Sequence, residues 1–176
     1  MRASLTAVAA LVIGAAPAAA ADNNHATPQE IIDKVHEAAA YLADVGDVGL
    51  PTFAEANSPF VWKDTYVFVL DCSADLTVSH PVNSNIGRPV STLKDVNGKP
   101  FGKLMCEAAA NPDGGWVEYM WPRPVEDKSD DALEEASTPS RKVTYVMTVP
   151  DRPYQVGAGD YDDTLTVDQL DKLLTE

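Results

Sequence analysis

Apolar residues occupy both faces of a predicted strand near the middle of the chain. Tyr66, Phe68 and Leu70 lie on one face and two valines on the other, because successive side chains of a strand point in opposite directions. A strand that is apolar on both faces is typical of burial on both sides. Small turn-forming residues follow, and strand composition then resumes and ends at His80, before a proline. The stretch 62–80 therefore predicts a central β-hairpin.

Capping boxes predict where two helices begin. Thr27, followed by Pro28 and with Glu30 three positions on, has the composition of a helix start. Apolar residues then recur at spacings of three and four until Gly46, which ends the helix. We expect this long helix to cover one face of the sheet. A second capping box, at 166–169, predicts a short C-terminal helix.

Further segments complete a sheet around the hairpin. Residues 115–121 are rich in aromatic residues, 143–149 in β-branched residues, and 154–161 contains two glycines where another chain segment or a ligand approaches closely. A short amphipathic helix is expected at 101–108, and the acidic, proline-containing segment 123–140 is predicted to be a solvated loop. Short turns between successive strands favour antiparallel pairing. The sequence thus predicts an α+β fold, with a five-stranded antiparallel sheet and a short helix inserted between strands.

The N-terminal residues have the three-part pattern of a secretory signal peptide. Residues 1–21 contain a basic residue, an apolar run and small residues with Ala-x-Ala spacing. The apolar run is shorter than the roughly 20 residues that a membrane-spanning helix needs, and an uncleaved membrane anchor is the alternative interpretation. We expect cleavage to leave residues 22–176 as one domain. The mature protein is predicted to be periplasmic or secreted and not embedded in a membrane.

The net charge of the chain limits the classes of binding partner that we expect. The formal net charge is −14, which argues against binding to nucleic acid and to anionic membrane surfaces. A small anionic ligand is still compatible with this charge, because a few donors in a dry pocket can outweigh a distant, salt-screened field. Local residues therefore decide whether an anion binds.

Two cysteines, Cys72 and Cys106, lie in a chain that is expected to be exported. A disulfide between them is the default expectation in that compartment, and closing a loop of this size contributes roughly 4 kcal/mol in the chain-entropy model. Metal ligation is the alternative, but the cysteines lack Cys-x-x-Cys spacing and the three histidines show no paired spacing. We predict a disulfide, with no metal site and no cofactor.

The sequence carries no recognisable catalytic motif. It lacks Gly-x-Ser-x-Gly, His-Glu-x-x-His and a phosphate-binding glycine loop. We therefore predict that the protein is not an enzyme, and the alternative is a site assembled from scattered residues. A module that docks on a membrane receptor is a third hypothesis, which the sequence does not separate from a ligand-binding module.

Aromatic residues suggest where a ligand binds. The even-numbered face of the central strand carries Tyr66 and Phe68, and the odd-numbered face of the aromatic strand carries Tyr119 and Trp121. His80 lies at the end of the hairpin. If these faces meet on the side away from the first helix, they enclose an apolar space with a few polar tips, which is the usual character of a small-ligand site. The alternative is that the aromatic residues simply form core.

The chain resembles the Cache family, in particular its small single-Cache sensory modules. The matching segments follow the family's order over most of the mature chain, and they are 66–71, 78–81, 86–87, 93–99, 116–122, 142–146 and 156–161. The resemblance implies a PAS-like antiparallel sheet with a long N-terminal helix on one face and a small-ligand pocket on the other. It also implies short carboxylates or amino acids as ligands. Asp160 departs from the family, which usually has an apolar residue there.

The resemblance adds Lys142 and Tyr145 as further pocket residues. Their numbering places them on opposite faces of a regular strand, so both reach one pocket only through a bulge or from a strand end. Lys142 would supply the positive charge that a carboxylate needs. No transmembrane helix or signalling domain follows the matched segments, so the chain resembles a free-standing module. We expect it to bind a small organic acid or amino acid without chemistry, with a role in signal transduction.

Overall fold

The sheet is built around the strand that the sequence predicts to be central. The computed structural model describes residues 24–126 and 133–175. Its strands are β1 (Val61–Trp62), β2 (Thr65–Asp71), β3 (Leu76–Ser79), β4 (Gly115–Glu126), β5 (Leu133–Thr148) and β6 (Tyr154–Asp160). They pair in the order β1-β2-β6-β5-β4, with β3 also on β2, and every pairing is antiparallel. The predicted α+β fold is confirmed, and the two-residue β1 is added to the five expected strands.

The helices begin where the capping boxes predict. The α-helices are α1 (Pro28–Val45), α2 (Phe101–Ala109) and α3 (Val167–Leu170), and the 3-10 segments are η1 (Gly46–Ala54), η2 (Asn83–Asn85), η3 (Val90–Thr92) and η4 (Asp171–Leu174). The Thr27 hydroxyl accepts from the amide of Glu30, whose side chain accepts in return from the amide of Thr27. Thr166 forms the same reciprocal pair with Gln169.

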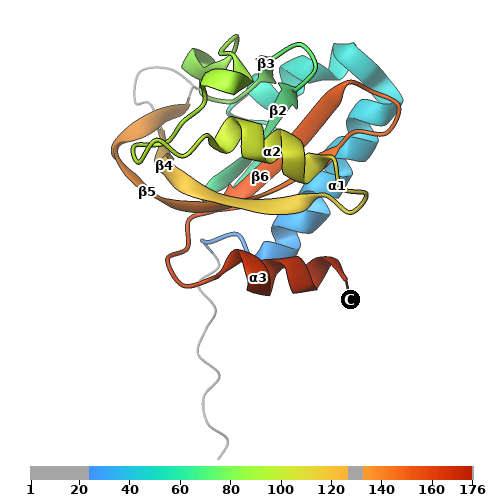
Figure 1. Cartoon of the computed structure of the whole chain (residues 1–176). Helices are drawn as coiled ribbons and strands as arrows, with labels where there is room; N and C mark the ends of the chain where they lie inside the picture. The colour runs from blue at the N-terminus through green and yellow to red at the C-terminus, as the bar shows by residue number, and fades with distance from the viewer. Residues whose placement is uncertain (1–23, 127–132, 176) are drawn as a thin grey trace, which may run out of the picture.

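Two helices cover the two faces of the sheet. Figure 1 shows α1 behind the sheet and α2 in front of it. On the α1 face, helix residues such as Ile31 and Leu42 pack with Val67 and Val69 of β2. On the α2 face, Phe101 and Met105 pack with the even-numbered side chains of β2. Every residue of β2 from Thr65 to Leu70 is buried, as a strand with two apolar faces requires.

The segment 123–140 is not the solvated loop that its composition predicts. In the described part of this segment, β4 continues to Glu126 and β5 starts at Leu133, with Val125 opposite Glu134. The register shifts between Pro122 and Pro124. β4 is the last strand of the sheet, and prolines are tolerated on edge strands and at bulges. The prediction was wrong because polar and proline residues suit an edge ribbon as well as a loop.

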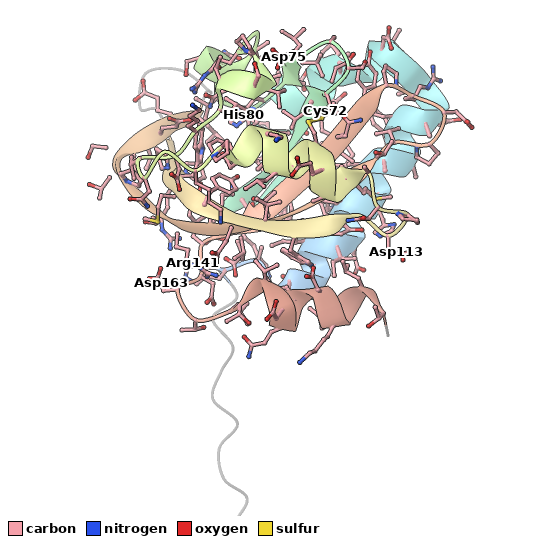
Figure 2. The ribbon with its side chains drawn as sticks, in the orientation of Figure 1. Cys72, Asp75, His80, Asp113, Arg141 and Asp163 are labelled. Atoms are coloured by element: carbon pink, nitrogen blue, oxygen red, sulfur yellow. A yellow bond between two sulfur atoms is a disulfide. The ribbon has the colours of Figure 1, made fainter. Side chains whose placement is uncertain are left out.

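A disulfide joins the end of β2 to α2. Cys72 and Cys106 are bonded, and Figure 2 shows Cys72 on the side of the sheet that α2 covers. This confirms the predicted pairing. The predicted signal peptide, 1–21, lies outside the described residues. Within the ranges 24–126 and 133–175, no helix has the length and apolar character needed to span a bilayer.

Candidate functional site

A small cavity lies between the α2 face of the sheet and α2 itself. It has a volume of about 30 Å³. Five residues predicted from the sequence all line it, and these are Tyr66, Phe68, His80, Tyr119 and Trp121. The other lining residues are Leu70, Thr77, Asn85, Leu93, Phe101 and Met105. The structure therefore brings the two aromatic faces and the end of the hairpin together on the side away from α1, as the sequence suggests.

Lys142 lies beside this cavity and is completely buried. Its register opposite Tyr119 places it on the α2 face. The Nζ atom lies 4.2 Å from the centre of the Tyr66 ring and 4.8 Å from that of Tyr161, so both rings are placed for cation–π contact. Among the described residues, Nζ has no hydrogen-bond partner. Burial lowers the pKa of Lys142 to about 7, although the carboxylates of Glu135, Asp64 and Asp160 act in the opposite direction.

His80 is a neutral donor at the edge of the cavity. Its Nδ1 accepts a hydrogen bond of 2.9 Å from the amide of Val82, which leaves the proton of the neutral ring on Nε2. Burial, with a smaller contribution from the charge of Lys142, lowers the pKa of His80 to about 3. The ring packs edge-on against Tyr66, with centroids 4.8 Å apart. His80 therefore stays uncharged at neutral pH and has one N–H to offer.

The aromatic residues hold one another in place. Tyr119 stacks on Phe101 with ring centroids 4.2 Å apart, and its hydroxyl lies 3.0 Å from that of Thr144. Burial raises the pKa of Tyr119 well above its ordinary value, so the phenol remains a neutral donor. At Gly159, a Cβ atom would lie 2.3 Å from the Thr144 hydroxyl oxygen and 2.9 Å from Lys142 Cε. This glycine leaves the room that Lys142 occupies.

Three polar residues of this region were not assigned to the candidate site from the sequence. Thr77 Oγ1 is buried and has no partner within the described residues, and Thr77 pairs with Leu70, so the hairpin register could have assigned it to this face. Asn85 donates to Glu135 at 2.6 Å from a loop that has no periodicity. Tyr161 follows directly after β6, and its hydroxyl donates to the carbonyl of Pro122 at 2.5 Å.

Tyr145 is not brought together with these residues. It lies on the α1 face, where its ring stacks on His36 with centroids 6.0 Å apart and its hydroxyl donates to the carbonyl of Asp113 at 2.8 Å. β5 pairs with β6 without a register shift from Val143 to Thr148. The alternation of a regular strand therefore holds, and Tyr145 points away from the cavity because Lys142 points toward it.

The arrangement suits the binding of an anion. One buried amine supplies positive charge, and His80, Tyr66 and Tyr119 supply neutral donors within a largely apolar surface. A carboxylate forms charge-assisted hydrogen bonds with an amine of this kind. Such bonds are strongest where water is excluded, which is the setting of this buried cavity.

The model of the Single Cache domain 2 family matches residues 6–171 of this chain. Three solved structures have the same fold. A periplasmic sensor domain of a chemotaxis protein is 22% identical, with TM-score 0.51, over 77% of this chain and 88% of its own. A Cache chemosensory domain described for carboxylic acid recognition is 21% identical, with TM-score 0.51, over 75% and 86%. A methyl-accepting chemotaxis protein from Vibrio parahaemolyticus is 22% identical, with TM-score 0.53, over 77% and 88%. No curated protein matches.

Proposed function

This chain belongs to the single Cache domain family, and we propose that it is an exported, non-catalytic module that binds a small organic acid or amino acid and takes part in signal transduction. The ligand would lie between the α2 face of the sheet and α2. One solved relative is described for carboxylic acid recognition, which agrees with this ligand class. The mature domain would comprise residues 22–176.

The observation that carries the proposal is the unpartnered Lys142 amine. Burying an amine without a hydrogen-bond partner is costly, and its Nζ atom has no such partner among the described residues. A ligand carboxylate at the cavity would restore the charge of the amine and supply the missing acceptor. His80 Nε2 and the Tyr66 hydroxyl would complete the set of donors.

Binding would require the aromatic side chains to move. A cavity of about 30 Å³ has room for only about two water molecules. An acid of a few carbon atoms would displace them and push apart the rings of Tyr66 and Trp121. A small increase in cavity volume therefore accompanies binding in this proposal.

Calorimetry with a panel of short monocarboxylates, dicarboxylates and amino acids tests the proposal. We expect one member of the panel to bind the wild type at one site per chain. Lys142→Met removes the amine while keeping an unbranched apolar side chain, and loss of a charge-assisted hydrogen bond of about 1.5–3 kcal/mol lowers affinity roughly 10- to 150-fold. Wild-type affinity should also fall about tenfold per pH unit above pH 7, because only the protonated amine pairs with a carboxylate.

The matched control is Lys103→Met. This lysine lies on α2 with 71% of its side chain exposed, and its Nζ lies 3.5 Å from the Glu107 carboxylate. The Lys103→Met substitution removes the same charge from the protein at a position away from the cavity, so the affinity for the ligand should not change. Equal affinity of the wild type and a correctly folded Lys142→Met variant would contradict the proposed site, and a wild type that binds no member of the panel would contradict the ligand class.

A further inference from the structure

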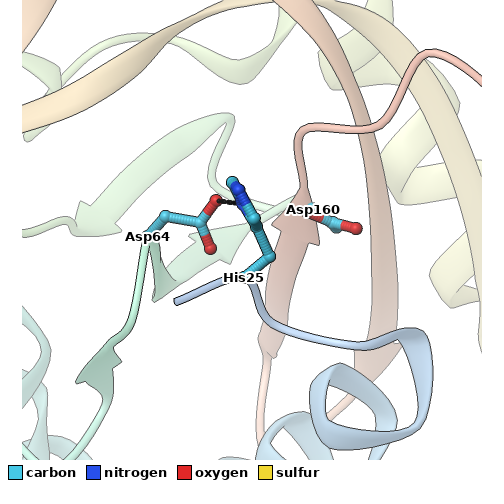
Figure 3. A group of neighbouring side chains, drawn as sticks. All are labelled: His25, Asp64 and Asp160. Atoms are coloured by element: carbon cyan, nitrogen blue, oxygen red, sulfur yellow. Dashed lines mark hydrogen bonds and ion pairs between the residues drawn. The ribbon is translucent and has the colours of Figure 1, made fainter. Parts of the chain in front are cut away.

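Three segments that are distant in the sequence meet at the N-terminal end of α1. His25 precedes the helix, Asp64 lies in the turn between β1 and β2, and Asp160 ends β6 (Figure 3). One ligand atom from each of these side chains lies within 4.8 Å of the other two. His25 Nδ1 and Asp64 Oδ2 are 2.6 Å apart. The cluster therefore combines one imidazole nitrogen with two carboxylate oxygens.

Asp160 is the buried member of the cluster. Only 6% of its surface is exposed, and its carboxylate accepts a hydrogen bond from the backbone amide of Tyr161. Burial and the neighbouring charge of Asp64 raise its pKa. A carboxylate that is buried beside another carboxylate needs a compensating positive charge.

The nearby cations form no ion pair with Asp160 within the described ranges. The buried Lys142 amine is close enough to interact electrostatically with Asp64 and Asp160, but it makes no hydrogen bond to either. Arg123 Nη1 lies 3.5 Å from the carboxylate of Asp64, and another of its nitrogens donates to the carbonyl of Tyr161. Lys63 Nζ is directed to the Glu30 carboxylate at 2.7 Å and to the carbonyl of His25 at 3.1 Å. Neither Arg123 nor Lys63 forms an ion pair with Asp160. An ion bound between the three side chains would therefore add positive charge where Asp160 has no direct lysine or arginine partner among the described residues.

We propose that His25, Asp64 and Asp160 bind a divalent transition-metal ion of the Zn²⁺ class. Three atoms that lie no more than 4.8 Å apart have a common centre within about 2.8 Å of each, so side-chain shifts of less than about 1 Å reach the bond lengths of roughly 2.0–2.2 Å that Zn²⁺ makes with imidazole and carboxylate. The imidazole nitrogen favours a transition metal over Ca²⁺ and Mg²⁺, which prefer oxygen ligands only. Water would fill the remaining position.

The surroundings already orient one of the ligands. Asp64 Oδ1 accepts a hydrogen bond of 3.2 Å from the amide of Ala26, which leaves Oδ2 directed at His25. When the ion binds, the hydrogen bond between His25 and Asp64 is replaced by two metal bonds, and the ring must be deprotonated at Nδ1. The amide contact persists as the outer support that metal-binding carboxylates usually have. The ion would then tie the segment before α1 to the end of β6.

Calorimetry and thermal denaturation with ZnCl₂ at pH 7 test this site, using the purified exported protein without an affinity tag and after treatment with a chelator. We expect one Zn²⁺ per chain and a rise in Tm on binding. Asp160→Asn and His25→Gln each remove a proposed direct ligand, so each should weaken binding by more than the roughly 10- to 100-fold that loss of an outer-shell partner costs. Asp163→Asn and His36→Gln, which change exposed residues of the same two types, are the matched controls and should leave binding unchanged.

A second readout separates loss of the ligand from loss of the fold. Asp160→Asn removes the buried charge next to Asp64, so the metal-free variant should melt no lower than the metal-free wild type, while its Zn²⁺-dependent rise in Tm disappears. The proposal is overturned if the wild type binds no Zn²⁺, if both cluster variants bind as tightly as the wild type, or if Ca²⁺ or Mg²⁺ binds more tightly than Zn²⁺.

Discussion

Replacing Lys142 with methionine should stabilise the protein while weakening ligand binding. The amine is completely buried and has no hydrogen-bond partner among the described residues, and its pKa falls from an ordinary value of 10.5 to about 7. At roughly 1.4 kcal/mol per pH unit, this lowered pKa means that burying the charged amine destabilises the folded protein by about 5 kcal/mol below pH 7. Methionine keeps the apolar part of the side chain and avoids this cost. We expect a net stabilisation of a few kcal/mol. This is less than the full desolvation cost because the substitution also alters the packing against Tyr66 and Tyr161.

The pH dependence identifies the origin of the gain. Between pH 7 and 10.5 the unfolded chain holds the lysine proton and the folded chain does not, so the contribution of Lys142 to stability rises with pH across that window. The advantage of Lys142→Met over the wild type should therefore be greatest at or below pH 7 and shrink toward pH 9.5. Urea denaturation of both proteins, from pH 6 to 9.5 without ligand, measures this difference. Contributions from groups common to both proteins cancel.

Lys103→Met is the control for this comparison too, because an exposed lysine on α2 should give a difference in stability that does not vary with pH. A Lys142→Met variant that is less stable than the wild type by over about 1 kcal/mol at pH 6 would refute the reasoning. The cation–π contacts of Lys142 with Tyr66 and Tyr161 would then outweigh its desolvation. A pH-independent gain would mean instead that the amine is solvated in the folded protein.

Two further predictions concern the disulfide and the N-terminus. Cys72→Ser with Cys106→Ser should lower the free energy of unfolding by about 2–5 kcal/mol, measured by urea denaturation, because the bond holds α2 to the end of β2; a loss under about 1 kcal/mol would contradict this. The intact mass of the exported protein should correspond to a chain that starts near Ala21 or Asp22, and a mass that includes Met1 would exclude cleavage.

Local signals in the sequence were sufficient for the elements that carry the cavity. The apolar faces of β2 and the capping box at Thr27 depend only on neighbouring residues, and both are confirmed. Alternation along β2 and β4 also selected the correct side chains for the α2 face. The pairing of segments that are distant in the sequence could not be predicted from neighbouring residues in the same way. Asn85 reaches the cavity through a loop, and β4 and β5 extend into a ribbon whose polar composition predicted a loop.

The position of Tyr145 shows where resemblance and alternation disagree. Resemblance to the family assigned both Tyr145 and Lys142 to the pocket, whereas strand geometry allowed only one of them unless a bulge intervened. The structure has no register shift at that point between β5 and β6, so alternation gives the correct result. For this pair, the face of the strand decides which side chain lies on the α2 side, and that side chain is Lys142.

Buried ionisable side chains distinguish one region of this sheet from an ordinary core. Lys142, His80 and Asp160 are each less than a tenth exposed, and apolar residues of similar size would fill the same space at lower cost. Folding alone therefore does not account for them. Their signs differ with position, since the amine lies beside an apolar cavity and the carboxylate beside a second carboxylate and an imidazole. An anion satisfies the first environment and a cation the second, so one sheet would hold two sites of opposite charge preference.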